Sequence, residues 1–404
     1  MRNALAGLRV LDFCWVGAGA LVTKLLAEHG AEVIKVESRA RPDNLRVAPP
    51  FGQSEESLER SGYFASRNND KKSFALNMQH PRSRELALQL AASSDLVTNN
   101  FRPGIMERWG LSYEAIRDVN PRVIYVSMPM QGSEGPHSTY VGFGSTIAAL
   151  AGLVHLSGLP DRAPVGTGTH YPDHIPSPGH ALVAVLAAIR QRNRTGEGRM
   201  IELSQFEATV NMIAPAIARA AAGNEGVERS GNRVAEHCPS GVFQCKGTDE
   251  WCAISVRSDA EWRAFTAELG RPELVDEPRF ASHVQRKANE NELEAVLVPL
   301  IRDRARGELA SALQARGVPA SAVLSSEDLF EDEHLAARGF WRKVQHPVMG
   351  EITAPAAPFL ADGERTGPEH AAPLLGAHTH EVGRTVLGLS DDEIDSLVEE
   401  KVLW

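Results

Sequence analysis

Cysteine is scarce in this chain, with four residues in 404, at positions 14, 238, 245 and 252. Four thiols are too few for a disulfide framework in a chain of this length, so we expect them to be reduced. The last three lie seven residues apart, but no Cys-x-x-Cys pair is present to hold a zinc ion. The sequence therefore predicts packed thiols and no metal site.

Long apolar runs are also missing, since no stretch reaches the ~18 residues that a membrane-spanning helix needs. The first residues lead directly into a strand pattern, without the features of a signal peptide. Acidic residues outnumber basic ones by 52 to 42, and the net charge of −10 disfavours nonspecific attraction to nucleic acid or to anionic membranes. We expect a cytoplasmic protein that binds neither nucleic acid nor membrane.

Hydrophobic residues are plentiful, at 43% of the chain, and 404 residues exceed one ordinary domain. Between residues 9 and 128, strand patterns alternate with helical patterns, as in a doubly wound sheet. The predicted fold class is therefore α/β, with a large Rossmann-like domain. The expected strands are residues 9–13, 31–37, 73–77, 96–99 and 123–128, and the expected helices are residues 20–28 and 81–92.

The alternation breaks near residues 223–226. Short strand patterns at residues 241–245 and 251–256, followed by polar helices, predict a smaller α+β domain. Beyond residue 340, prolines and glycines are frequent until a helical pattern at residues 391–400. We expect a large domain (1–222), a small domain (223–335) and a C-terminal segment (336–404).

Asp173 stands between two prolines near the middle of the chain. Pro172 fixes its own φ and Pro176 biases the preceding residue away from helix, so an irregular loop is expected here. Ser177 is a good N-cap and Pro178 suits the first helical position, which predicts a helix start just downstream. The positive end of that helix favours an ionised carboxylate, and we interpret Asp173 as a nucleophile.

The helix that follows is apolar on nearly every side over residues 181–189, which suggests that it is buried. A basic Thr-Gly-x-Gly turn at residues 195–198 comes after it, and residues 200–204 have a strand pattern. Taken alone, an aspartate beside prolines is more often a turn cap than a nucleophile. The interpretation of Asp173 therefore depends on the wider pattern.

That wider pattern runs along almost the whole chain as a series of blocks in a fixed order. The blocks are residues 5–13, 16–19, 30–37, 69–77, 100–110, 120–125, 194–204, 317–320, 346–350 and 372–379. In order and spacing they resemble the class III CoA-transferases, the family of formyl-CoA transferase and carnitine CoA-transferase. One block alone would be a weak signal, whereas the ordered series is specific.

The resemblance implies an enzyme that moves CoA from an acyl-CoA donor to a carboxylic acid acceptor, without a metal or a tightly bound cofactor. It implies that the carboxylate of Asp173 forms a mixed anhydride with the donor and then an aspartyl-CoA thioester. It also implies that the C-terminal segment returns to the large domain. Two subunits are expected to form an interlocked homodimer.

A CoA site needs cations or helix N-termini for its phosphates and a flat apolar surface for adenine. Asn100 and Phe101 lie at the end of a predicted strand, at the edge where open sheets bind ligands. Trp109 is expected either to stack on the adenine or to fill the core, and any single cation could equally be solvated surface. The CoA-binding residues that the resemblance implies are Val16, Gly17, Arg39, Lys71, Lys72, Asn100, Phe101, Arg102 and Arg108.

Two departures from the family pattern bear on the substrate. Formyl-CoA transferase has a glutamine at the position of Gly17, and a run of glycines in the small lobe that has no counterpart between residues 225 and 262. A less glycine-rich cover, with Arg233 available to grip a second carboxylate, favours a larger or dicarboxylic acyl group. Arg233 could equally form a salt bridge between the two lobes.

A racemase of the same superfamily is the main alternative. The related α-methylacyl-CoA racemase uses a histidine in a Gly-His-Asp block as part of its acid/base pair, and here Phe143 takes that place. Phenylalanine cannot exchange a proton, which favours acyl transfer. His170 and His174 flank Asp173 and keep the alternative open, because either could orient it or reach the substrate.

A dinucleotide fingerprint is the third interpretation. Gly17 and Gly19 follow a predicted strand, and Glu37 ends the next one, as in an NAD-dependent oxidoreductase. The third glycine of that fingerprint would fall at Val22, whose side chain hinders close packing of helix on sheet. The sequence therefore favours CoA over NAD.

Overall fold

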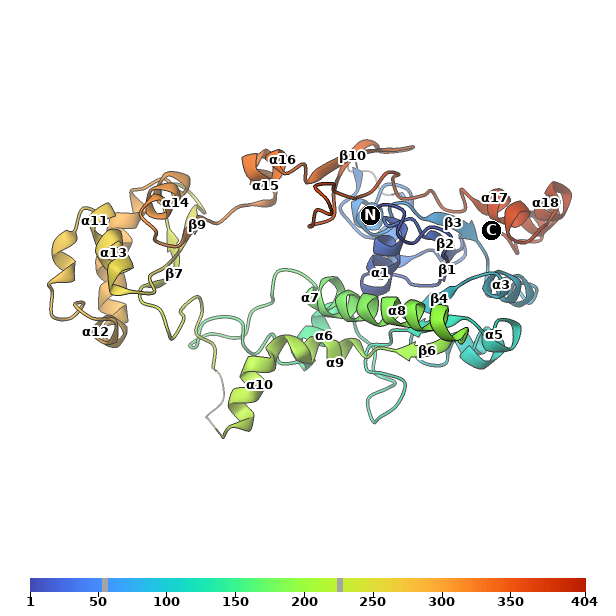
Figure 1. The fold of residues 1–404 in the computed structure, drawn as a ribbon, viewed down its shortest axis with the longest axis horizontal. Coiled ribbons are helices and arrows are strands. Elements are labelled where there is room, and N and C mark those ends of the chain that lie inside the picture. Colours follow the sequence, from blue (N-terminus) through green and yellow to red (C-terminus); the bar gives the residue numbers. More distant parts are fainter. Residues whose placement is uncertain (53–56, 224–227) are drawn as a thin grey trace. The chain divides into compact units, whose positions relative to one another are not determined.

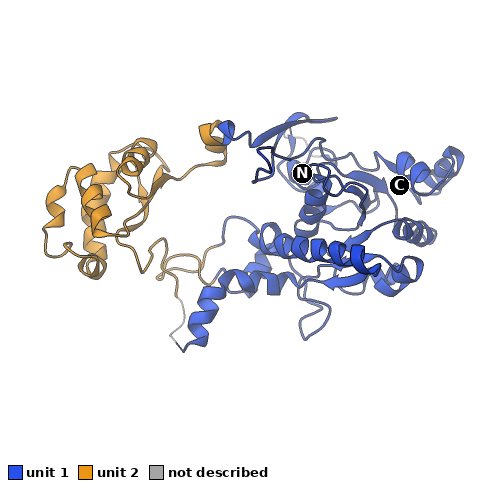
Figure 2. Cartoon of the chain, in the orientation of Figure 1, with its two compact units in different colours: residues 1–154, 166–227, 335–404 blue, residues 155–165, 228–334 orange. Residues whose placement is uncertain are grey.

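The computed structural model describes residues 1–52, 57–223 and 228–404. The chain divides into two compact units, coloured separately in Figure 2. The larger unit comprises residues 1–154, 166–227 and 335–404, and the smaller one comprises residues 155–165 and 228–334. Residues 155–165, assigned to the large domain from the sequence, thus cluster with the smaller unit, and the three predicted domain ranges stay a prediction. Residues 224–226, part of the predicted boundary, lie outside the described residues.

The larger unit is built on a six-stranded sheet (Figure 1). Its strands are β1 (Arg9–Asp12), β2 (Glu32–Glu37), β3 (Lys72–Ala75), β4 (Leu96–Asn99), β5 (Ile124–Ser127) and β6 (Arg199–Glu202). All neighbours are parallel, in the order β3-β2-β1-β4-β5-β6. This is the order of doubly wound Rossmann folds, so the predicted α/β class with a parallel sheet is confirmed.

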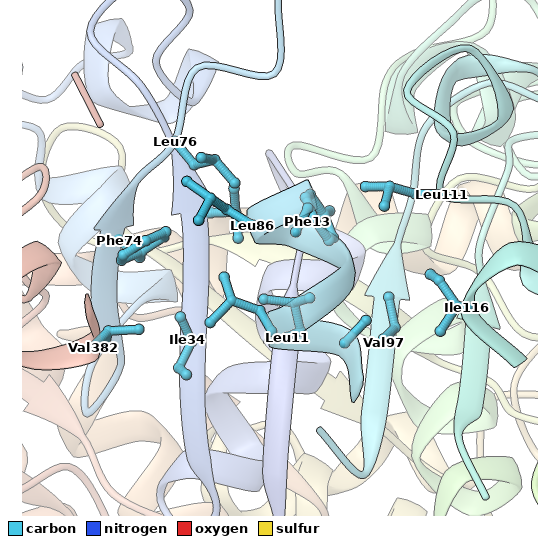
Figure 3. Packing of buried hydrophobic residues seen from close by; sticks show 14 of the residues in the cluster. Leu11, Phe13, Ile34, Phe74, Leu76, Leu86, Val97, Leu111, Ile116 and Val382 are labelled. Atoms are coloured by element: carbon cyan, nitrogen blue, oxygen red, sulfur yellow. The ribbon is translucent and has the colours of Figure 1, made fainter. Parts of the chain in front are cut away.

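The helices that contribute to the core on one face of this sheet include α3 (Ser83–Ala92), α5 (Tyr113–Val119), α17 (Thr379–Thr385) and α18 (Asp391–Glu399). Figure 3 shows Leu11 and Val97 of the strands in one cluster with Leu86 of α3. Val382 of α17 and Ile394 of α18 belong to the same cluster. The last residues of the chain therefore pack on the sheet that the first residues build.

A second core cluster contains residues of α1 (Ala18–Ala27) and α8 (Pro176–Thr195). Ala181 and Val185 of α8 are buried in it, whereas Val183 is 71% exposed and Leu186 is 47% exposed. The expectation of a helix buried on nearly every side is therefore wrong for the single chain. An apolar pattern shows that a surface should be covered, but it does not show which molecule covers it.

Shorter elements complete the larger unit around the sheet. They are η1 (Asn44–Val47), α2 (Gly62–Arg67), α4 (Ile105–Arg108), α6 (Gly144–Leu150), α7 (Tyr171–His174), α9 (Gln205–Val210), η3 (Asn211–Ile213), α10 (Ala214–Ala221), β10 (Trp341–His346) and β11 (Gly350–Pro355). α16 (Glu333–Ala337) spans the end of the smaller unit and the return to the larger one.

The smaller unit holds a three-stranded antiparallel sheet in the order β7-β8-β9. Its core buries Trp262, Phe265 and Leu293 completely, together with three of the cysteines. The elements are β7 (Ser240–Gln244), β8 (Trp251–Ser255), α11 (Asp259–Glu268), η4 (Pro272–Val275), α12 (His283–Ala288), α13 (Glu290–Arg302), α14 (Arg306–Ala315), β9 (Ala320–Ala322) and α15 (Ser326–Glu331).

The four cysteines are free and buried. Among residues 1–52, 57–223 and 228–404, no group of three or more His, Cys, Asp or Glu side chains is placed to hold a metal ion. In the same part of the chain, no helix is both long and apolar enough to cross a bilayer.

Candidate active site

Asp173 lies in α7, a single helical turn whose N-cap is His170. The expectation of an irregular loop is wrong here. Pro172 sits in the first turn of α7, where its missing N–H would have had no helical partner and its φ suits a helix. A proline at that place starts a helix as readily as it breaks one.

The start of α8 also differs from the prediction. Ile175 is the N-cap, and Pro176 and Pro178 both lie in the first turn, so Ser177 is inside the helix. The Ser177 hydroxyl is buried and has no hydrogen-bond partner among the residues that the structure describes, so it does not cap the helix. The helix ends at Thr195, and Gly196 follows in the left-handed region at φ 80°, as a glycine C-cap requires.

The carboxyl group of Asp173 is held between two glycines. A Cβ added at Gly17 would lie 2.6 Å from Cβ of Asp173, and one added at Gly144 would lie 2.6 Å from its Oδ2. Both distances are shorter than real contacts, so only glycine at these two positions admits the carboxyl group. The Gly144 N–H also donates a hydrogen bond to Asp173.

Burial controls the protonation of Asp173, whose residue surface is 7% exposed. Desolvation raises the pKa of Asp173 to about 6, against opposing effects of His170, the Gly144 amide and Arg67. The carboxylate form therefore prevails at neutral pH, yet it is poorly solvated. A desolvated carboxylate beside hydrogen-bond donors is suited to attack a carbonyl carbon.

The loop between β1 and α1 forms one wall of the site. Val16 adopts φ 63°, in the left-handed region, and its N–H donates to Oδ1 of Asp43 over 3.0 Å. Lys35 Nζ donates to Oδ2 of Asp43 and to the carbonyl of Cys14, each over 2.8 Å, and both charged side chains are fully buried. A buried ion pair thus holds the loop that carries Gly17 against Asp173.

A cavity of about 330 Å³, the first cavity, opens beside Asp173. Its walls include residues that come directly after β1 and β4 in the sequence. The strand order reverses between these two strands, and sheets of this kind bind ligands at that point. The predicted site residues that line it are Val16, Gly17, Asn100, Phe101, Arg102, Arg108, Phe143 and Asp173. Further lining residues that the sequence did not single out for this site include Trp15, Arg41, Asn44, Ile105, Met130, Tyr140 and Gln205.

Aromatic rings line the first cavity in a row. Phe101 meets Trp15 edge-on at 5.2 Å and Trp109 edge-on at 5.3 Å between ring centroids. Arg41 lies over Trp15, with its Cζ 5.8 Å from the ring centroid. The side-chain amide of Asn100 accepts a hydrogen bond from the backbone N–H of Trp15 and donates one to the backbone carbonyl of Trp15. The Asn100 side chain therefore has a structural role. The result is an apolar aromatic wall with arginines beside it.

The predicted cations divide into two groups. Arg102 and Arg108 line the first cavity, and Arg39 is exposed but does not line it. Lys71 is fully buried and donates to Asp12 Oδ2, to the Ala20 carbonyl and to Asn68 Oδ1, which uses all three of its N–H groups.

Lys72 is likewise engaged elsewhere. Its Nζ lies 2.8 Å from Glu32 and 2.7 Å from Glu381, and it does not line the first cavity. The structure therefore does not bring Lys71 and Lys72 to the first cavity, contrary to the expected phosphate contacts. Arg41, which the sequence analysis did not select, lies there instead.

A second cavity, of about 450 Å³, lies between α2, α6 and α7. His170 and His174 line it, on either side of Asp173 in sequence. Nδ1 of His174 is 3.2 Å from Nη2 of Arg67. Burial, Arg67 and His170 lower the pKa of His174 to about 4, so its ring is neutral at pH 7.

Arg233 belongs to the smaller unit, where its charge is already matched. Its Nη2 lies 2.6 Å from Glu294 Oε2, and its Nε lies 2.9 Å from Oε1 of the same side chain. Asn291 accepts a further hydrogen bond at 2.7 Å. Arg233 thus forms a salt bridge within the smaller unit, and not the salt bridge between lobes that was the alternative.

Comparisons with known proteins show which family this sequence resembles along its length. Residues 5–379 match CoA-transferase family III. The chain is 34% identical over 406 residues to a probable CoA-transferase of Mycobacterium tuberculosis, covering 98% of this chain but half the length of that relative. It is 30% identical to the succinyl-CoA:glutarate CoA-transferase of Mus musculus, covering 98% of this chain and 89% of the relative.

A solved structure extends the similarity to three dimensions. The crystal structure of a CaiB/BaiF family protein from Brucella suis aligns with a TM-score of 0.88 at 28% identity, covering 96% of this chain and all of that one. The family match spans the strands, the two glycines at Asp173 and most of the C-terminal segment. The chain therefore belongs to CoA-transferase family III, the class III CoA-transferases.

Proposed function

We propose that this chain transfers CoA from an acyl-CoA thioester to a carboxylic acid through covalent intermediates on Asp173. The observation that carries the proposal is the position of the Asp173 carboxyl. It is buried between Gly17 and Gly144 at one wall of a cavity whose other walls are aromatic and basic. A nucleophile at the end of a ligand-sized cavity is what acyl transfer needs.

The reaction proceeds by four acyl transfers. An Asp173 oxygen attacks the thioester carbon, and the C–S bond breaks to give a mixed anhydride and CoA thiolate. The thiolate attacks the aspartyl carbon, so the donor acid leaves and an aspartyl-CoA thioester remains. The acceptor carboxylate then displaces the thiolate to form a second anhydride, and the thiolate takes the new acyl group and frees Asp173.

Each transfer passes through a tetrahedral oxyanion, which hydrogen-bond donors stabilise. The Gly144 N–H is already directed at the Asp173 carboxyl, and the first amides of α1 begin at Gly17, in contact with the same side chain. Backbone donors of this kind need no reorganisation during the reaction. We assign the oxyanion contacts to these two backbone segments.

The CoA arm would lie in the first cavity. Adenine suits the surface formed by Trp15, Phe101 and Trp109, and the phosphates suit Arg41, Arg102 and Arg108. This assignment replaces the expected lysine contacts with arginines.

The acids that we favour are dicarboxylic. Succinyl-CoA:glutarate CoA-transferase, a relative of full-length similarity, is named for two dicarboxylic acids. Gly17 stands where formyl-CoA transferase has a glutamine, and its lack of a side chain leaves room for an acyl group larger than formyl.

The two alternatives fit the site less well. Phe143, in the place of the racemase histidine, lines the first cavity and cannot exchange a proton, although His170 remains close enough to lower the pKa of Asp173. Val22, in the place of the third dinucleotide glycine, is completely buried in the core. Acyl transfer needs the Asp173 carboxylate alone.

A homodimer is part of the proposal. The apolar side chains that α8 leaves uncovered in the single chain suit burial against a second copy, as the family resemblance implies. CoA thioesters and acids are the remaining partners.

Trapping of the acyl enzyme tests the proposal directly. Incubation with succinyl-CoA and then hydroxylamine should convert Asp173 into its hydroxamate, a mass change that peptide mass spectrometry assigns to one residue. Asp173→Asn should abolish both the adduct and CoA exchange, and its CoA affinity should stay within about threefold of the wild type because the first cavity is intact. Exchange that persists in Asp173→Asn would contradict the mechanism.

A further inference from the structure

Arg67, the last residue of α2, is a cation without a matching acid beside the reacting carboxylate. Its Nη2 lies 3.2 Å from His174 Nδ1, and its Nη1 lies 3.5 Å from the Ser66 carbonyl. Its Nε is buried and has no hydrogen-bond partner in the described part of the chain. Among residues 1–52, 57–223 and 228–404, no carboxylate forms an ion pair with Arg67.

The buried arginines in the described part of the chain each have a carboxylate partner. Arg46 lies 2.7 Å from Glu37, Arg192 lies 2.8 Å from Asp95, and Arg286 lies 2.8 Å from Asp259. Removal of a guanidinium from water without an anion is unfavourable, so such pairs are the expected arrangement. Arg67 is half-buried, has no such partner among the described residues and lies beside the helical turn that carries Asp173.

The neighbours of Arg67 position its charge without neutralising it. His174 is neutral at pH 7 and accepts a hydrogen bond, and the Tyr63 ring lies 5.6 Å from Cζ of Arg67. Both of these neighbours line the second cavity. The guanidinium is thus held by side chains that form the wall of a hollow large enough for a short acyl chain.

The reacting carboxyl group is close to this arrangement. Asp173 and His174 are adjacent in α7, and the charge of Arg67 acts on the Asp173 carboxyl through space. A short diacid with one carboxyl at Asp173 can therefore present its other carboxyl to Arg67. Arg233, the arginine expected to do this from the sequence, is occupied by Glu294.

We propose that Arg67 binds the distal carboxylate of a short dicarboxylic acyl group, whose chain lies in the second cavity beside His174. The inference rests on the proposed CoA transfer at Asp173 and specifies its substrate class. A planar guanidinium with a free Nε and held by a neutral histidine can offer a carboxylate two parallel N–H donors. The same residue would select diacids over monoacids of equal length, because a methyl group leaves the buried charge without a partner.

Isotope exchange measures this selectivity with acids of equal chain length. One assay follows label from [14C]succinate into succinyl-CoA, and the other follows label from [14C]butyrate into butyryl-CoA. Arg67→Met should lower kcat/KM for succinate exchange about 10²-fold, as expected for loss of a charged hydrogen-bond partner, and change butyrate exchange by less than about threefold. Arg67→Lys keeps the charge but not the two parallel N–H donors, so its kcat/KM for succinate exchange should lie between those of the wild type and Arg67→Met.

Arg117→Met is the matched control. Arg117 also lies over a tyrosine ring, 5.5 Å from the centroid of Tyr113, but Tyr113 lines neither the first cavity nor the second, whereas Tyr63 lines the second. Both exchange rates should equal those of the wild type. If Arg67→Met does not fold, as judged by thermal melting, the selectivity of Arg67→Lys decides the question.

Two results would overturn the inference while leaving the CoA-transferase intact. One is an equal loss of succinate and butyrate exchange in the Arg67 variants, which would indicate a structural role only. The other is a wild-type enzyme that prefers butyrate to succinate. Failure of the proposed function is distinguishable, because then no acyl-CoA, butyryl-CoA included, would give a hydroxylamine adduct on Asp173.

Discussion

At the scale of single residues, Asp173 combines two requirements that oppose each other. It must be ionised to attack, and it must be removed from water to react efficiently. Burial alone would keep it protonated, and His170, the Gly144 amide and Arg67 act in the opposite direction. The resulting pKa of about 6 leaves an anion at neutral pH whose solvation is nonetheless poor.

This balance predicts an acidic limb in the pH dependence of CoA exchange. The protonated carboxyl group cannot attack, so kcat/KM should be constant above pH 7 and fall about tenfold per pH unit well below the Asp173 pKa of about 6. His174, with a pKa of about 4, stays neutral across the limb and does not contribute to it. The pH dependence of kcat/KM is obtained from initial rates at saturating acceptor and limiting acyl-CoA.

His170→Gln provides the check on this assignment. His170 is the largest of the effects that lower the pKa of Asp173, so its replacement by a neutral amide should move the limb to higher pH. A limb near the ordinary aspartate value, or one that His170→Gln leaves in place, would show that another group controls the rate.

Residue identity alone predicted part of this site. Asp173, Gly17, Arg102 and Arg108 could be selected because they fall in family motifs, and all four line the first cavity. Lys71 fell in a motif too, but its partners include Asp12, 59 positions away in sequence. A local sequence pattern identifies a cationic side chain, but it does not identify the distant carboxylate that forms an ion pair with it.

At the scale of elements, the β1–α1 loop determines how closely backbone approaches Asp173. The loop depends on Asp43, which comes after β2 in sequence and accepts from Val16 while paired with Lys35. The strand-turn-helix order was readable from the sequence. The contacts that fix the turn were not, because Lys35 and Asp43 reach Cys14 and Val16 only when β1 and β2 lie side by side.

Gly17→Ala tests the close approach of this loop. Gly17 has φ −82°, so alanine causes no backbone strain, but its Cβ would lie 2.6 Å from Cβ of Asp173. We expect kcat/KM for CoA exchange to fall about 10²-fold, since a displacement of about 1 Å is enough to misalign a nucleophile. CoA affinity, measured by titration calorimetry, should change much less.

Gly307→Ala is the control for this substitution. Gly307 lies in α14 of the smaller unit and has no described atom within 4 Å of an added Cβ, so the variant should be as active and at least as stable as the wild type. Wild-type activity in Gly17→Ala would show that Asp173 does not need its present position.

The same scale shows where element prediction fails. Strands β1, β2, β4 and β5 fall within the predicted ranges because buried parallel strands are short apolar runs with clear boundaries. The short helix α7 was missed and the start of α8 was misplaced, because prolines are compatible both with a loop and with the first turn of a helix. Sequence position did not distinguish these cases.

At the scale of the whole molecule, the larger unit leaves apolar surface on neighbouring elements uncovered. Val183 is 71% exposed and Leu186 47% exposed on α8, and Met200 is 43% exposed on β6. β6 is also an edge strand of the sheet, and α8 and β6 contact each other. Apolar side chains gathered at a sheet edge are unfavourable in water and favour association. The apolar pattern of residues 181–189 is thus consistent with burial in an assembly of two chains.

From this exposed apolar surface we predict a dimer, which charged substitutions on α8 should disrupt. The wild type should have twice the mass of one 43.8 kDa chain in light scattering after size-exclusion chromatography, and Val183→Glu with Leu186→Glu should shift it to the monomer. Two carboxylates buried without partners would cost more than most interfaces gain. Val284→Glu, at a 76% exposed valine of the smaller unit between polar neighbours, should leave the mass unchanged. A monomeric wild type, or a dimer unaffected by the α8 double variant, would show that this face does not form the interface.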